Sequence, residues 1–157
     1  MMEVALPQGR KLTIEHVVFD YNGTLAEAGR MREPVKKKLA VLATQVHVAI
    51  ITADTFGQAK QELAGVAGVE LIVLPEGATG KEKAQYVHEW GAENTVAVGN
   101  GVNDQAMFMA AGLRICVLGS EGANSGLLAA SNIVVGSPDD ALDLLLEPLR
   151  LVATLRP

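Results

Sequence analysis

The chain has 157 residues, of which 49% are hydrophobic and 20% charged, and its formal net charge at pH 7 is −5. This size and composition predict a single globular domain over residues 1–157 with a proper hydrophobic core. An acidic chain disfavours nucleic acid or an anionic membrane as its main partner. No apolar run approaches the ~18 residues that would span a bilayer, and the N-terminus lacks the apolar core of a signal peptide, so we expect a cytoplasmic protein.

Extended and helical patterns alternate along the chain. Residues 1–15 contain two short extended segments around Pro7-Gln8-Gly9-Arg10, which predicts a hairpin arm. Further strands are predicted at 17–19, 46–51, 69–74, 95–98, 113–118 and 133–135. Helices are predicted to begin at Pro34, to cover about 56–64, to open after Thr79, to end at Ala111, to cover 122–130, and to begin at Ser137.

This alternation predicts an α/β fold, a doubly wound three-layer sandwich around a mostly parallel sheet of five to six strands. The connections are short throughout, so we expect no cap or second domain. Thr79 and Glu82 match a capping box at a helix start. We expect Met107, Phe108 and Met109 to pack against the sheet, and the single cysteine, Cys116, to be a buried thiol.

Polar side chains follow three of the predicted strands where each strand ends. In a parallel sheet these carboxyl ends lie along one edge, which is where open α/β sheets bind ligands. These side chains are carboxylates, hydroxyls and amides: Asp20, Thr24, Thr52, Asn100, Asn103 and Asp104. A lysine, Lys81 or Lys83, opens the helix that precedes the predicted strand 95–98. Together they supply a nucleophile, hydrogen-bond donors, a cation and oxygen ligands for a metal.

In order and type, these residues resemble the four motifs of the haloacid dehalogenase-like (HAD) superfamily. Asp20 with Gly23-Thr24-Leu25 is similar to the first motif, Thr52 to the second, and Gly99–Asp104 to the fourth. For the third-motif lysine we prefer Lys83, because Tyr86, Val87 and Trp90 lie at +3, +4 and +7 from it; Lys81 stays open. Within the superfamily, Asp20-Tyr21-Asn22-Gly23-Thr24-Leu25 most resembles the phosphorylation domain of P-type ATPases, whose motif reads Asp-Lys-Thr-Gly-Thr-Leu.

The resemblance implies a Rossmannoid HAD fold without a cap, and a phosphatase that passes through an aspartyl-phosphate on Asp20. It assigns catalysis to Asp20, Thr24, Thr52 and Lys83, with Ala53 and Asn103 as further contacts of the phosphate. It assigns a Mg²⁺ ion to Asp20, Asn22, Asn100 and Asp104. The implied partner is a small phosphorylated substrate, and capless members commonly shape substrate access by packing into homo-oligomers or act on large substrates.

Two residues depart from the family pattern. Asn22 stands where HAD phosphatases usually have the aspartate that serves as general acid and base, and an amide cannot titrate. Asn100 replaces the usual metal-binding aspartate, which removes one negative charge. Both changes favour slow turnover or donors whose leaving group needs no proton. The alternative is a phosphate- or metal-binding regulatory module of HAD fold that does not hydrolyse its ligand.

Other readings of the same residues are weaker. Gly99-x-Gly101 after a strand invites a dinucleotide site, but Asp104 occupies the third glycine position and would repel a pyrophosphate. A receiver domain also uses an aspartate, a threonine and a lysine, but on strands in a different order. His16, His47 and His88 show no metal-ligand spacing, so we expect surface or core roles for them.

Overall fold

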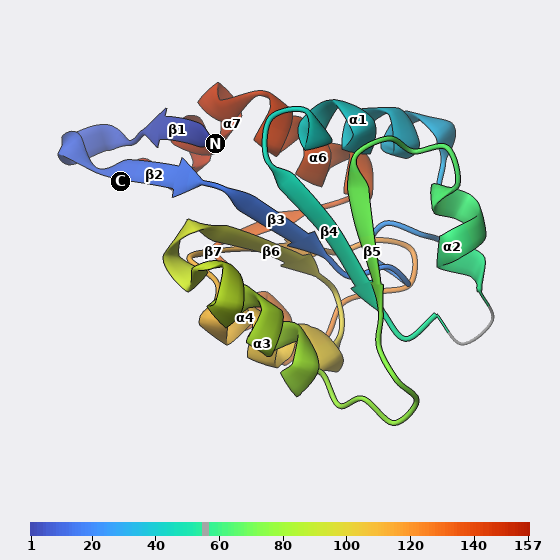
Figure 1. Cartoon of the computed structure of the whole chain (residues 1–157). Helices are drawn as coiled ribbons and strands as arrows, with labels where there is room; N and C mark the ends of the chain where they lie inside the picture. Colours follow the sequence, from blue (N-terminus) through green and yellow to red (C-terminus); the bar gives the residue numbers. More distant parts are fainter. Residues whose placement is uncertain (55–56) are drawn as a thin grey trace.

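The structure is a computed structural model that describes residues 1–54 and 57–157. Within these ranges, six parallel strands form one sheet, in line with the five to six strands expected, and their order is β5-β4-β3-β6-β7-β8 (Figure 1). The strands of this sheet are β3 (His16–Phe19), β4 (His47–Thr52), β5 (Val69–Val73), β6 (Thr95–Gly99), β7 (Leu113–Val117) and β8 (Ile133–Val135). Their all-parallel pairing confirms the expected α/β architecture.

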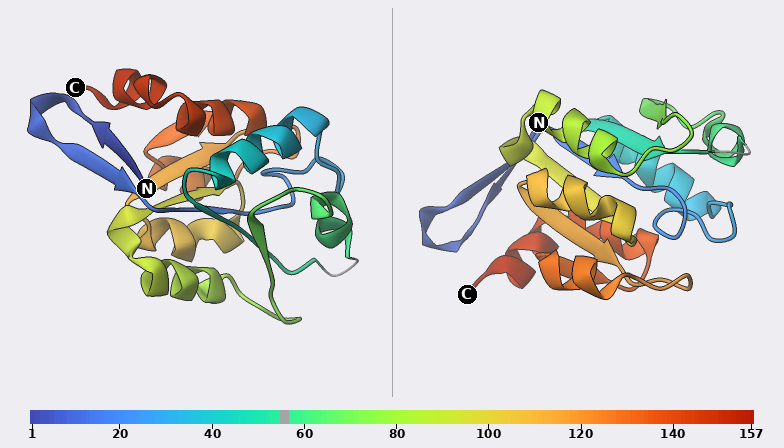
Figure 2. Two further views of the ribbon diagram at one scale, coloured as in Figure 1. Left: turned by 45° about the horizontal axis from the view of Figure 1, so that its top comes forward. Right: turned by 90° about the horizontal axis from the view of Figure 1, so that it is seen from below.

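Helices cover both faces of the sheet and make the three-layer sandwich (Figures 1 and 2). The helices on one face are α1 (Glu33–Ala43), α2 (Gln58–Leu63), α6 (Pro138–Leu146) and α7 (Pro148–Leu155), and those on the other are α3 (Lys81–Trp90), α4 (Gln105–Ala110) and α5 (Ser125–Ala130). The described residues contain no cap domain. They also contain no helix with the length and apolar character that crossing a membrane requires.

Alternating side chains of the central strands build two separate cores. In β3, Val17 and Phe19 pack with the α1 and α6 side, whereas Val18 packs with the α3 and α4 side. A strand buried on both faces needs a continuous apolar run, which explains why Val17-Val18-Phe19 carries no polar residue. Cys116 of β7 is fully buried in the second core, as predicted.

The first two strands, β1 (Met2–Ala5) and β2 (Lys11–Ile14), pair antiparallel in a hairpin that extends from the body of the protein (Figures 1 and 2). The 3₁₀ turn Pro7–Gly9 joins them. Val4 and Ile14 are buried in the same core as Leu151 of α7, so the base of this arm is held by apolar contacts.

The chain reverses its direction across the sheet between β3 and β6. After β3 it adds β4 and β5 on one side, and the strands from β6 to β8 lie on the other. Ligands of open α/β sheets bind in the crevice outside the strand ends at such a switch point. The carboxyl ends of β3 and β6 are where Asp20 and Asn100 lie.

Several predicted boundaries differ from the structure. Helix α2 begins at Gln58, and the predicted start at Phe56 lies outside the described residues. Helix α5 begins at Ser125 instead of 122, because the Asn124 side chain caps it by accepting the Leu127 N–H at 3.1 Å. Met109 is 69% exposed, so the expectation that it packs on the sheet was wrong.

The start of α3 also differs from the predicted capping box. Glu82 accepts the backbone N–H of Thr79 at 3.1 Å, which is one half of the box. The residue at the N-cap is Gly80, with φ of 93°, and no side chain caps the helix there. A carbon atom added at Gly80 would lie 2.3 Å from the backbone oxygen of Asn103, so this glycine allows α3 to approach the turn after β6.

Candidate active site

Asp20 follows β3 directly and is almost completely buried. Its backbone N–H donates to the Val98 carbonyl of β6 at 2.9 Å. This bond extends the pairing of β3 with β6 by one residue and fixes the backbone position from which the Asp20 side chain projects. One carboxylate oxygen, Oδ1, accepts from Lys83 Nζ at 2.7 Å, and the other, Oδ2, accepts from Thr24 Oγ1 at 3.1 Å. The side chain is therefore held in one orientation by two donors.

Lys83, and not Lys81, is the lysine that reaches Asp20. Its side chain is buried in α3, and Nζ also donates to Asp104 Oδ1 at 2.9 Å, whereas Lys81 is exposed. The other oxygen of Asp104 accepts the backbone N–H groups of Asn100 and Gly101, each at 3.1 Å. Asp104 thus ties the turn after β6 to the lysine and, through it, to Asp20.

The charges of this cluster shift each other's titration. Burial and the nearby Asp104 carboxylate raise the pKa of Asp20 to about 6, although Lys83 opposes that shift. Burial by itself lowers the pKa of Lys83, but its two carboxylate partners raise it above the ordinary lysine value. Lys83 is therefore a cation at neutral pH.

The loop after Asp20 turns back tightly, and Gly23 allows it to do so. Gly23 has φ of 79°, a conformation that side chains with a Cβ rarely adopt. A Cβ there would also lie 2.3 Å from Asn100 Nδ2. The turn brings the Thr24 hydroxyl within 3.1 Å of both Asp20 Oδ2 and Asn100 Oδ1, so its single proton serves two acceptors.

Tyr21 fixes the same loop from the other side of the sheet, a role that the sequence analysis missed. The ring is fully buried, and its hydroxyl donates to the Gly29 carbonyl at 2.6 Å. Burial, with the charges of Glu62 and Asp54, raises the pKa of Tyr21 to about 12, so it stays a neutral donor. An aromatic residue directly after a strand-ending acid was the signal available in the sequence.

A cavity of about 240 Å³ lies over Asp20 and contains every predicted phosphate contact. Its lining comes from the segments after β3 and β4, the starts of α2 and α3 and the turn after β6: Asp20, Asn22, Thr52, Ala53, Asp54, Gln58, Lys83 and Asn103. Asp54 and Gln58 had not been predicted. Thr52 Oγ1 accepts the Asp54 N–H at 3.2 Å, and the Asp54 carboxylate accepts the N–H groups of Ala59 and Lys60 at 2.8 and 3.3 Å.

The residues expected to hold a metal ion divide into two groups. Asp20 and Asn22 line this cavity, and Asn100 Oδ1 approaches the same Thr24 hydroxyl as Asp20 does. Asp104 is fully buried behind them, and its oxygens serve Lys83 and the backbone. No group of three or more histidine, cysteine or acidic side chains in the described residues could hold a metal.

The donor set nevertheless fits Mg²⁺, which prefers oxygen ligands and usually keeps several waters beside one or two carboxylates and a substrate phosphate. The oxygens available are the Asp20 carboxylate, the Asn100 amide and the backbone carbonyl of Asn22. With a single carboxylate facing the cation, we expect weaker binding than a site with two would give.

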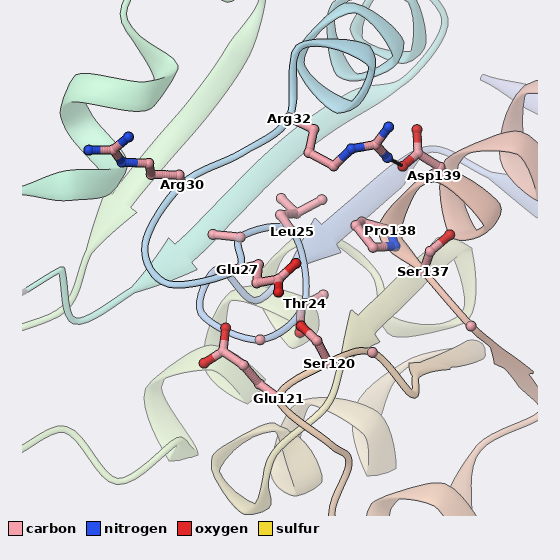
Figure 3. Close-up of a pocket in the computed structure, with 14 residues that line it drawn as sticks. Thr24, Leu25, Glu27, Arg30, Arg32, Ser120, Glu121, Ser137, Pro138 and Asp139 are labelled. Atoms are coloured by element: carbon pink, nitrogen blue, oxygen red, sulfur yellow. Dashed lines mark hydrogen bonds and ion pairs between the residues drawn. The ribbon is translucent and has the colours of Figure 1, made fainter.

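A second cavity, of about 270 Å³, lies beside the loop after Asp20 (Figure 3). It is lined by the loop after Asp20 and by the turns after β7 and β8, including Thr24, Glu27, Ser120, Glu121 and Ser137. The Ala28 N–H donates to Glu121 at 3.2 Å, and Arg32 pairs with Asp139 across one side. Thr24 is the residue that this cavity shares with the Asp20 cluster.

Two of the histidines meet at the opposite, amino-terminal end of the sheet. His16 and His47 are register partners on β3 and β4, and their Nδ1 atoms lie 2.9 Å apart. His47 Nε2 contacts Glu70 at 2.6 Å, and Trp90 stacks on His16 with ring centroids 5.7 Å apart. Their position, far along the strands from Asp20, separates them from the candidate active site.

Comparison with known proteins supports the same fold. No protein-family model matches the chain. The cobalt-bound deoxy-D-mannose-octulosonate 8-phosphate phosphatase of Haemophilus influenzae superposes with a TM-score of 0.71 at 17% identity, covering 92% of this chain and 94% of that one. The Moraxella catarrhalis 3-deoxy-D-manno-octulosonate 8-phosphate phosphatase, in complex with magnesium, phosphate and KDO, superposes with a TM-score of 0.69 at 14% identity, covering 91% and 94%.

A structure from Streptomyces avermitilis named as a HAD family hydrolase gives a TM-score of 0.64 at 19% identity over 84% of this chain and 88% of that one. In sequence, the uncharacterized protein MJ0073 of Methanocaldococcus jannaschii is 52% identical over 78 residues, which are 47% of this chain and 84% of that protein. The chain therefore has the fold of the HAD family hydrolases and belongs to the same family as this uncharacterized archaeal protein.

Proposed function

We propose that the protein is a Mg²⁺-dependent phosphatase that forms an aspartyl-phosphate on Asp20. The observation that carries this proposal is the buried contact of Asp20 with Lys83 and Thr24 at the floor of a cavity that Thr52 and Asn103 also line. The fold shared with sugar-phosphate phosphatases supports it. Asp20, Thr24, Thr52 and Lys83 are the proposed catalytic residues.

In this proposal one carboxylate oxygen of Asp20 attacks the phosphorus atom in line with the leaving group. Negative charge accumulates on the equatorial oxygens of the phosphoryl group in the transition state. Lys83 and Thr52 donate hydrogen bonds to these oxygens, and the backbone N–H groups of Ala53 and Asn103 donate to them as well. Thr24 holds the second oxygen of Asp20. A Mg²⁺ ion held by Asp20, Asn100 and the Asn22 carbonyl would neutralise part of the charge of the phosphate.

Within the HAD superfamily, we propose that the chemistry most resembles that of the phosphorylation domain of P-type ATPases. The reason is Asn22, which stands where HAD phosphatases usually have a second aspartate. The proposal takes residues 1–157 as one unit acting in the cytoplasm on a small phosphorylated substrate, with homo-oligomer packing as a means of shaping the open cavity. Neither nucleic acid nor membrane is part of it.

Phosphate release tests the proposal. Protein incubated with Mg²⁺ and p-nitrophenyl phosphate or acetyl phosphate should release phosphate above background, and Asp20→Asn, which keeps the shape of the side chain, should abolish the release. Equal release by the two proteins would contradict the proposal.

The second candidate is a phosphate-binding module without turnover, and the neutral Asn22 and Asn100 favour it. Calorimetric binding of phosphate in the presence of Mg²⁺, together with no release from any donor, would support this candidate instead.

A further inference from the structure

The acids that face the cavity over Asp20 are few, and each is already engaged. Among the described lining residues, the carboxylates are those of Asp20 and Asp54. Asp20 is the proposed nucleophile and cannot also protonate the leaving group. Residues 55 and 56, which follow Asp54, are threonine and phenylalanine and carry no acid.

Asp54 is in the cavity wall but is committed to the start of α2. Its Oδ1 accepts the Ala59 N–H at 2.8 Å and its Oδ2 accepts the Lys60 N–H at 3.3 Å. Asp54 also has φ of 38°, a backbone conformation that needs support from its surroundings. Both oxygens of Asp54 are therefore engaged as acceptors by the first turn of α2.

Asn22 is the polar side chain nearest to Asp20 in the sequence among the described residues that line the cavity. It is exposed and lines the cavity two residues after Asp20, at the start of the tight turn. Its amide can donate a hydrogen bond but cannot transfer a proton. Lys83 is held between two carboxylates, which favour its charged form.

Resting on the proposed function, we infer that the site accepts phosphoryl donors whose leaving group departs as a stable anion without a proton, of which acyl phosphates are the chemical class. Attack by Asp20 forms one O–P bond, while the bond from phosphorus to the leaving carboxylate breaks and its electron pair departs with that carboxylate. The second step is slow, because none of the described lining residues is free to accept the proton of the attacking water. Water oxygen then bonds to phosphorus, its proton passes to solvent, and Asp20 recovers its electron pair, so the phosphorylated protein accumulates.

The test compares three donors with Mg²⁺: acetyl phosphate, p-nitrophenyl phosphate and glycerol 3-phosphate. The proteins are wild type, Asn22→Asp and the control Asn94→Asp, which adds the same charge at the amino-terminal end of β6. Each reaction is quenched in acid, and phosphorylation is measured by mass spectrometry of the intact protein, with phosphate release measured in parallel. Because the comparison is between variants for one donor, the intrinsic reactivity of each donor cancels.

For glycerol 3-phosphate, Asn22→Asp should raise the rate of phosphate release by roughly 10²–10⁴-fold, which is the usual contribution of general acid catalysis. For acetyl phosphate, Asn22→Asp should not speed the labelling, because this leaving group needs no proton, but the phosphorylated protein should disappear faster. Asn94→Asp should match wild type throughout.

An equal effect of Asn22→Asp on all three donors, or wild-type turnover of glycerol 3-phosphate as fast as that of Asn22→Asp, would overturn the inference while leaving the phosphatase intact. No labelling and no phosphate release from any donor would overturn the proposed function itself.

Discussion

Lys83 is the residue on which the charge balance of the site depends. It is 2% exposed and contacts two carboxylates that are themselves buried, at 2.7 and 2.9 Å. Removing one partner of a buried ion pair leaves an uncompensated charge, which usually costs about 3–5 kcal/mol.

We therefore expect Lys83→Met to lower the free energy of unfolding by about 3–5 kcal/mol at pH 7.5. Urea denaturation measures this change, and Lys81→Met, an exposed lysine two residues earlier on the same helix, provides the matched control. A loss below about 1 kcal/mol for Lys83→Met would mean that the two carboxylates do not need this cation.

In the proposed Mg²⁺ site, Asn100 stands beside Asp20 as a neutral ligand. Its Oδ1 lies 3.1 Å from Thr24 Oγ1, which Asp20 also contacts, and its Nδ2 donates to the Gly122 carbonyl at 3.2 Å. Asn100→Asp adds a second carboxylate and should tighten Mg²⁺ binding by at least about tenfold, which corresponds to ~1.4 kcal/mol. Titration calorimetry without substrate measures the affinity. Unchanged affinity would place the cation away from this side chain.

At the scale of elements, the start of α3 is held against the turn after β6. Gly80 has φ of 93°, and a Cβ there would lie 2.3 Å from the Asn103 carbonyl oxygen. Gly77 has a similar φ of 84°, but its Cβ would meet nothing within 4 Å. The two glycines therefore separate backbone strain from steric contact.

Gly77→Ala should cost about 1–2 kcal/mol of stability from its left-handed conformation alone. Gly80→Ala should cost that and a further ~1–3 kcal/mol from the displaced turn. Thermal and urea unfolding of both variants measures the difference. Equal losses would show that α3 can move away from Asn103 freely.

At the amino-terminal ends of β3 and β4, His16 and His47 form a contact that depends on pH. Burial lowers the pKa of His16, and the nearby His47 lowers it further, against the opposing effects of Glu15 and of the Trp90 backbone. The His16 imidazole therefore binds its proton more tightly in the unfolded chain than in the folded protein. The stability that neutral His16 contributes is present above the unfolded pKa of about 6.5 and is lost as the pH falls below that value.

His16→Asn, which can keep a donor near the position of Nδ1, should flatten the decrease in unfolding free energy between pH 7.5 and 5.5. The raised pKa of Asp20 gives a slope of the opposite sign, so the difference between the two proteins isolates His16. Parallel curves for the two proteins would show that His16 does not contribute to this slope.

At the scale of the whole molecule, the alternation of strands and helices was enough to predict the sheet. The convergence of Asp20, Thr52, Asn103 and a lysine could also be reasoned from the sequence, because the carboxyl ends of parallel strands share one edge. Lys83 could be preferred over Lys81 because the apolar register of Tyr86, Val87 and Trp90 follows it.

Other features depend on how loops close and were not accessible from spacing. The inward turn of Asp104 arises from two backbone N–H groups that point at its carboxylate. The Tyr21 hydroxyl finds a carbonyl eight residues away only after the loop has folded. The second cavity forms between three turns that are far apart along the chain, and no pattern within one segment records it.

The proposed mechanism requires Asp20 to carry the phosphoryl group. Protein incubated with acetyl phosphate and Mg²⁺, quenched in acid and digested, should show the added mass of one phosphoryl group on the peptide that contains Asp20, and Asp20→Asn should show none. A phosphoryl group found on another residue, or equal labelling of the wild type and Asp20→Asn, would contradict it.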